Sequence, residues 1–143
     1  MEFRPLFTLR LSVAAAQDFG VTPHNTRLTF PVTGGSFEGE RLRGKVLPGG
    51  ADWVTRRADG VLELDLRITL ETDDGALVHM TFVGIRDDAP PHDDPGTAAP
   101  PYFHTSSRFE TAAAKYAFLN RVLAVGTGEI TPAGPVHVFE EVL

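Results

Sequence analysis

The stretch that decides the fold is Val61-Leu-Glu-Leu-Asp-Leu-Arg-Ile-Thr-Leu-Glu-Thr-Asp-Asp-Gly75. Because a β-strand sends successive side chains to opposite faces, its alternating pattern predicts a strand with one apolar and one ionisable face. The apolar face carries Leu62, Leu64, Leu66, Ile68 and Leu70. The ionisable face carries Glu63, Asp65, Arg67, Thr69 and Glu71. Asp73-Asp74-Gly75 is a turn signal and residues 77–83 alternate again, so the two segments predict an antiparallel hairpin.

Similar alternation recurs along the chain and predicts an all-β fold. Further strands are expected at residues 3–13, 26–32, 42–47, 102–108, 121–125 and 136–142. One short helix is expected near residues 112–119, with Thr111 as its cap. An antiparallel sheet of this size hides its apolar face by closing or by packing on a second sheet, and the long strands favour closure. The prediction is a single domain over residues 1–143, an antiparallel β-barrel of about eight strands, with a mobile acidic Pro/Gly loop at residues 87–101.

Composition limits the classes of partner. Thirteen Lys and Arg against 19 Asp and Glu leave a net charge of −6, and nucleic-acid binding depends on clustered cations, so no nucleic-acid partner is expected. No apolar run approaches the roughly 20 residues of a membrane helix, and the N-terminus lacks the pattern of a signal peptide. These features predict no membrane association and a cytoplasmic location. The chain has no cysteine, which excludes disulfides and thiolate chemistry.

Three blocks of sequence resemble the DUF3237 (UPF0311) family. They are Thr33–Trp53 with its glycine pairs, Leu64–Gly75, and Tyr102–Thr111 followed by Tyr116–Asn120. The resemblance spans nearly the whole chain and rests on the combination of blocks at these spacings. It implies a small calycin-like antiparallel β-barrel and implies no reaction, because the family's role is unassigned. The family often has Arg after the Tyr-Phe pair, where this chain has His104; if that side chain faces a pocket, the ligand chemistry differs from that of its relatives.

Two groups around the central hairpin are candidates for a ligand site. Asp52-Trp53 sets an aromatic wall beside a carboxylate, which suits a small organic ligand; alternatively, Trp53 only fills the core or covers a barrel end. Arg67 and Glu71, with His79 on the partner strand, form an acid–base cluster if the ionisable face points into the barrel. If that face points to solvent, the same residues form cross-strand ion pairs.

A second polar group is Tyr102, His104 and Arg108, next to the loop at 87–101. His104 is suited to proton transfer near neutral pH, although a histidine in a half-exposed strand also commonly just bonds a neighbour. Asn120 is interpreted as a structural residue that pins the helix. The glycines at 34–39 and the five dispersed histidines match no nucleotide-binding or metal-binding spacing, so neither cofactor nor metal is expected.

Together these features predict a barrel that handles a small organic ligand. The first hypothesis is a cofactor-independent acid–base enzyme, an isomerase, cyclase or dehydratase acting on an apolar oxygenated metabolite. Glu71, His104 and Arg67 are its predicted catalytic residues, Asp52, Trp53, Tyr102 and Arg108 its predicted ligand-binding residues, and the 87–101 loop its lid. A non-catalytic carrier or sensor is the alternative. A third reading is an assembly protein with a closed barrel, whose last strand pairs with another copy in a homo-oligomer.

Overall fold

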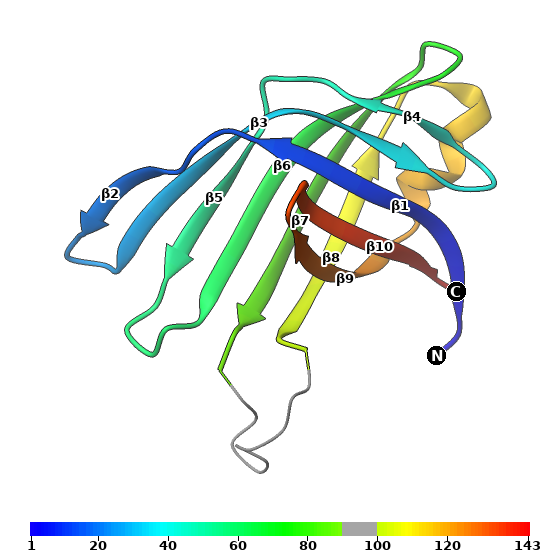
Figure 1. Cartoon of the computed structure of the whole chain (residues 1–143). Helices are drawn as coiled ribbons and strands as arrows, with labels where there is room; N and C mark the ends of the chain where they lie inside the picture. Colours follow the sequence, from blue (N-terminus) through cyan, green and yellow to red (C-terminus); the bar gives the residue numbers. More distant parts are fainter. Residues whose placement is uncertain (90–99) are drawn as a thin grey trace.

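The computed structural model describes residues 1–89 and 100–143, which form one antiparallel sheet closed into a barrel (Figure 1). The predicted all-β class and barrel are therefore confirmed, whereas most of the predicted lid lies outside the described residues. The strands are β1 (Phe3–Val13), β2 (Gln17–Val21), β3 (Thr26–Glu38), β4 (Arg43–Val46), β5 (Ala51–Arg56), β6 (Leu62–Thr72), β7 (Leu77–Asp87), β8 (Tyr102–Glu110), β9 (Ala124–Thr131) and β10 (Gly134–Val142).

The barrel has eight positions around its ring, because two positions are each filled by two strands in succession, β1 with β2 and β4 with β5. On one side of β3, β4 pairs with its second half and β5 with its first half, and both also pair with β6. On the other side, β1 pairs with the second half of β3 and β2 with its start. The pairing of β1 with both β3 and β10 closes the ring. In Figure 1, β2 and the start of β3 extend away from the β9–β10 hairpin at one end.

The apolar face of the central strand points into the barrel. Leu64, Leu66, Ile68 and Leu70 of β6 are buried. They pack in one core cluster with residues from the neighbouring strands, including Met80 and Phe82 of β7. For a strand that alternates so regularly, the folded state is most stable when the leucines are buried and the charged side chains remain in water.

One end of the barrel is closed by a 3₁₀ helix, η1 (Ala114–Arg121), between β8 and β9. Tyr116 and Leu119 of η1 are buried in the core, and the Tyr116 hydroxyl donates a hydrogen bond of 2.9 Å to Asp74 in the β6–β7 turn. The expected pinning role of Asn120 is observed: its side chain accepts from the Thr111 N–H at 2.8 Å and donates to the Thr111 carbonyl at 2.9 Å.

A largely buried ion pair strengthens the same end. Arg41, in the β3–β4 loop, contacts Glu141 of β10 at 2.7 Å. The Arg41 guanidinium also lies 4.8 Å from the ring centroid of Phe118 in η1. Loop, strand and helix are thereby joined at one point.

Several local predictions differ from the structure. The helix is a 3₁₀ helix that begins two residues later than expected, and its cap position is Ala113 with no side-chain cap. The Thr111 hydroxyl instead donates to the Leu77 carbonyl at 2.8 Å and accepts from the Ala113 N–H at 3.2 Å. β2 and β5 are not among the predicted strands, and β3 continues through Gly34-Gly35 to Glu38. The strand expected at residues 121–125 is β9, which begins only at Ala124 because η1 ends at Arg121. Among the described residues, no helix has the length and apolar character needed to cross a membrane.

Candidate functional site

A cavity of about 360 Å³ opens at the end of the barrel opposite η1. Its wall is mostly apolar, with residues from β1, β3 and β5–β10. The apolar lining is Leu11, Val13, Leu28, Phe30, Val54, Leu62, Leu64, Leu66, Phe103, Ile130 and Pro135. The titratable and charged side chains that line it are Asp52, Arg56, Arg86, Asp88 and His137. A concave apolar wall with a few converging polar groups is typical of a small-molecule site.

Asp52 is the carboxylate inside this cavity. It lies on the inner face of β5 with Val54 and Arg56. The β5–β6 ladder has no residue pairs between Asp52↔Leu66 and Thr55↔Glu63, and in this gap Asp52 Oδ1 accepts the Asp65 N–H at 3.1 Å. Burial raises the pKa of Asp52 from 3.8 to about 7; the Asp65 N–H opposes the rise and the Asp65 charge adds to it. Both protonation states are therefore populated near neutral pH, as general acid–base chemistry requires.

His137 lies on β10 and is almost fully buried, with 2% of its surface exposed. Its ring stacks on Phe139 at 5.9 Å and meets the edges of Phe82 and Phe103 at 5.2 Å each. Burial lowers the pKa of His137 from 6.5 to about 4, so the imidazole is neutral at physiological pH. Among the described residues its Nδ1 is buried and has no hydrogen-bond partner, so one polar atom beside the cavity is unsatisfied.

Small residues on β9 make room for these rings. Gly128 pairs with His137 in the β9–β10 ladder, and a Cβ at Gly128 would lie 2.5 Å from Cδ1 of Phe103. No side chain larger than hydrogen therefore fits there without displacing the Phe103 ring.

The mouth carries two arginines with different surroundings. Arg86 forms a bidentate ion pair with Asp88, with Nε–Oδ1 at 2.9 Å and Nη2–Oδ2 at 3.0 Å. Its guanidinium also lies 5.7 Å from the Phe103 ring centroid. Arg56, at the end of β5, makes no ion pair or side-chain hydrogen bond with any residue that the structure describes.

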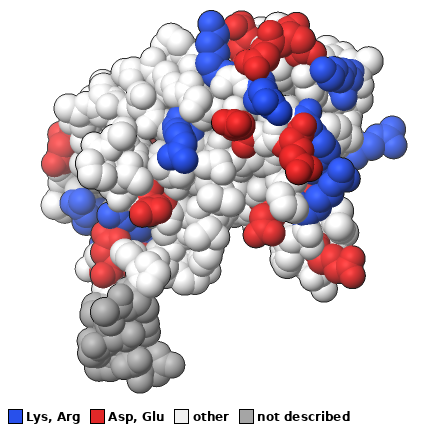
Figure 2. Space-filling model, turned by 45° about the vertical axis from the view of Figure 1, so that its right-hand side comes forward, with Lys and Arg blue, Asp and Glu red and all other residues white. Residues whose placement is uncertain are grey.

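Three of the predicted site residues lie outside the barrel. The Arg67 guanidinium sits 5.8 Å from the Trp53 ring centroid, with 62% of its side chain exposed. Glu71 lies 3.4 Å from Lys45 on the adjacent strand. The expectation that Arg67, Glu71 and Trp53 line the interior does not hold, because the leucines of β6 take the inner face. Figure 2 shows cations and anions close together over one side of the surface, as expected for cross-strand ion pairs.

The second predicted group also lies on the outer face. In β8 it is Phe103, Thr105, Ser107 and Phe109 that are buried, which turns Tyr102, His104 and Arg108 outward. Tyr102 and His104 meet edge to face at 4.7 Å, and His104 Nδ1 lies 3.3 Å from the Gly126 carbonyl oxygen. Of the seven predicted site residues, only Asp52 lines the barrel cavity.

The structure adds four cavity residues that the sequence analysis missed: Arg56, Arg86, Asp88 and His137. The alternation of β10 contains a signal for His137, since it shares a face with Phe139. That signal is ambiguous, because Val136 and Val138 make the opposite face equally apolar.

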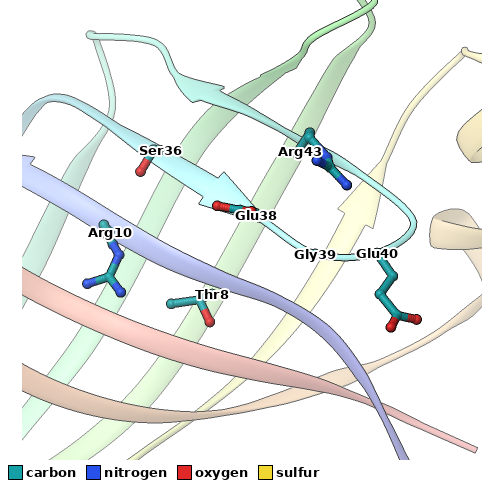
Figure 3. A pocket seen from close by; sticks show the side chains of 7 residues that line it. All are labelled: Thr8, Arg10, Ser36, Glu38, Gly39, Glu40 and Arg43. Carbon is teal, nitrogen blue, oxygen red and sulfur yellow. The ribbon is translucent and has the colours of Figure 1, made fainter.

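A second depression, of about 420 Å³, lies on the outer surface (Figure 3). Thr8 and Arg10 of β1, Ser36 and Glu38 of β3, Gly39, Glu40, and Arg43 of β4 line it. All but Thr8 and Gly39 are exposed, so it lacks the buried walls of the inner cavity. Among residues 1–89 and 100–143 no group of three or more His, Asp or Glu side chains is placed to hold a metal ion.

Bacterial and fungal proteins resemble this chain. A UPF0311 protein from Rhodopseudomonas palustris is 33% identical over 89% of this chain and 87% of its own length. The crystal structure of this same bacterial protein, described as a conserved protein of unknown function, superimposes with a TM-score of 0.89 at 33% identity, covering 99% of this chain and 97% of that chain. The hydroalkoxylation enzyme phnH from Penicillium herquei is 30% identical over 85% of this chain and 70% of its own.

A crystal structure of an enzyme from Penicillium herquei also has this fold, with a TM-score of 0.77 at 25% identity over 99% of this chain and 94% of that chain. The family described as "Protein of unknown function (DUF3237)" matches residues 1–142. With that match, the chain belongs to the DUF3237 family.

Proposed function

We propose that the barrel cavity binds a small, largely apolar oxygenated molecule and that Asp52 transfers a proton to and from it in a cofactor-independent reaction. The observation that carries this proposal is a carboxyl with a pKa of about 7 in an apolar cavity. A general acid–base group is most effective when its pKa lies near the working pH.

The chemistry proposed is the addition of an alcohol O–H across a carbon–carbon double bond. The name of the fungal relative, a hydroalkoxylation enzyme, supports this choice. Protonated Asp52 gives its proton to one alkene carbon while the hydroxyl oxygen bonds to the other. The hydroxyl proton then returns to the Asp52 carboxylate. The balance needs no oxidant or reductant, and an intramolecular version is a cyclisation.

His137 has a positioning role in this scheme. Its imidazole is neutral at physiological pH, so a substrate that reaches the unsatisfied Nδ1 would gain a hydrogen bond there without adding charge. The surrounding rings of Phe82, Phe103 and Phe139 fix the orientation of that hydrogen bond.

The test uses a panel of alkenols whose hydroxyl can reach their own double bond, with the cyclic ether detected by gas chromatography and mass spectrometry. Wild-type protein is expected to form ether faster than buffer alone, and Asp52→Asn to lose most of that rate. Glu71→Gln is the matched control, since Glu71 lies outside the barrel. An equal rate for wild type and Asp52→Asn would contradict the acid–base role.

The same cavity also supports a carrier, since most of its lining is apolar. N-phenyl-1-naphthylamine, an uncharged fluorescent probe, separates the outcomes. Binding of the probe without conversion of any alkenol would favour the carrier. Absence of binding would contradict both the enzyme and the carrier, since both need a cavity that binds small molecules. Leu62→Trp, at the cavity mouth, is expected to block binding.

A further inference from the structure

We infer that the natural ligand of the barrel cavity is an amphipathic organic anion, and that Arg56 binds its anionic group at the mouth. This inference rests on the proposed function and adds the substrate class. In this inference Arg56 binds the anionic end of the ligand, whereas Asp52 contacts the opposite end.

Arg56 differs from its neighbours in what surrounds its charge. Arg86, across the mouth, is neutralised by Asp88 at 2.9 Å, and Arg57, the next residue along the chain, is bonded to Asp59. Arg56 has no such partner among the residues described, although it lines the cavity. An arginine guanidinium with all its donors free is well suited to a carboxylate, sulfonate or phosphate.

The backbone sets the distance between the two ends of the ligand. Asp52 and Arg56 are four residues apart on one face of β5, so their Cα atoms are roughly 13 Å apart at about 3.3 Å per residue. Val54 lies between them, and Leu62 and Leu64 of β6 line the same wall. A ligand that reaches both groups therefore has an apolar body on the order of 10 Å long.

The charges elsewhere in the cavity fit one anion at the mouth rather than one at depth. The interior holds a carboxyl and a neutral histidine, both surrounded by apolar side chains, and an anion beside them would lose its hydration without gaining a cation. The anionic group is expected at the exposed end, where Arg56 meets solvent.

Two fluorescent probes with the same aromatic body test this inference. 8-Anilinonaphthalene-1-sulfonate carries a sulfonate, and N-phenyl-1-naphthylamine lacks it. The wild-type protein is expected to bind the sulfonate probe more tightly than the uncharged probe. Arg56→Gln is expected to lower the affinity for the sulfonate probe about three- to tenfold and to leave the affinity for the uncharged probe unchanged. Arg56→Lys is expected to retain part of the preference, and Arg57→Gln all of it.

The outcomes separate the inference from the proposed function. If Arg56→Gln leaves both affinities unchanged, or weakens both equally, the anion site is wrong while the cavity remains a binding site. If the wild type binds neither probe, the cavity does not bind small molecules, and both the inference and the proposed function are overturned. Added salt should weaken the sulfonate probe alone in wild type, and have little effect in Arg56→Gln.

Discussion

At the scale of single residues, burial shifts the pKa values of two cavity residues in opposite directions. It raises the pKa of the Asp52 carboxyl and lowers that of the His137 imidazole, because in both cases the apolar surroundings disfavour the charged form. Between about pH 4 and pH 7 both groups are therefore mainly neutral. The interior of the cavity gains a charge only outside that range, from His137 in acid and from Asp52 in base.

Asp52→Asn is expected to stabilise the folded protein at alkaline pH. The folded state holds the Asp52 pKa at about 7 against 3.8 when unfolded, so the folded state binds the proton more tightly. The contribution of this carboxyl is fully present below pH 3.8 and is lost as the pH rises through 7. Urea unfolding at pH 8 should show the variant more stable by about 4 kcal/mol, with the difference nearly vanishing by pH 4. A difference independent of pH would contradict the shifted pKa.

His137→Phe is expected to gain stability relative to wild type as the solution becomes acidic. The pKa of His137 is about 4 when folded and 6.5 when unfolded, so wild type loses stability as the pH falls from 6.5 through 4. Phenylalanine keeps the ring contacts and does not titrate. Between pH 7 and pH 5 the difference in unfolding free energy should move by about 2 kcal/mol in favour of the variant. A constant difference across this range would mean that His137 is not desolvated.

At the scale of elements, β9 illustrates how a strand contributes by what it lacks. Gly126 and Gly128 face the interior, and the space that their side chains would take is filled by Phe103 and Phe139 from the adjacent strands. The depth of the cavity is therefore set by rings on β8 and β10.

Gly128→Ala is expected to destabilise the barrel and to disturb the cavity. The new Cβ would lie 2.5 Å from Phe103 Cδ1, and overpacking of this kind costs about 1–3 kcal/mol. Gly34→Ala is the matched control, since the nearest atom to its Cβ is the Val46 carbonyl oxygen at 3.8 Å. Urea unfolding compares the two, and equal midpoints would show that Phe103 moves aside without cost.

The alternation of β6 predicts a strand and a hairpin, and its recurrence along the chain predicts the closed barrel. It left open which face points inward, because the pattern is the same whether the leucines or the charges face the cavity. The prediction that Arg67 and Glu71 line the interior rests on that ambiguity, and the cost of burying charge turns both side chains outward instead. His137 was missed for a different reason: β10 is apolar on both faces, with Val138 exposed on the outside. Long-range pairing, absent from a single strand's pattern, brings Asp52 and His137 into one cavity.

At the scale of the whole molecule, the two ends of the barrel divide the work. The end near η1 is closed by packed rings and hydrogen bonds, whereas the other end holds the cavity and its charged mouth. Substitutions that weaken the closed end should therefore reduce stability without changing the residues that face a ligand.

Arg41→Met is expected to lower the free energy of unfolding by about 3–5 kcal/mol, because it leaves Glu141 as a nearly buried carboxylate with no cation. Arg41→Met combined with Glu141→Met should recover most of that loss, since neither charge is then buried. Urea unfolding of the two single variants and the double variant at pH 7 gives the coupling. Additive losses would show that the pair is effectively solvated.

The paired short strands beside β3 have a mechanical consequence. On one edge the partner changes from β1 to β2, and on the other from β4 to β5, both close to Pro31 and Val32. At this level the Ala14 N–H bonds the Pro31 carbonyl and the Val32 N–H bonds the Gly50 carbonyl. On both sides of β3 the wall is therefore divided into two strands at the same level, whereas β3 itself is continuous. Because both changes of partner fall at the same level, we expect the half of the wall that carries β2 and β5, at the cavity mouth, to open more readily than the half that carries β1 and β4.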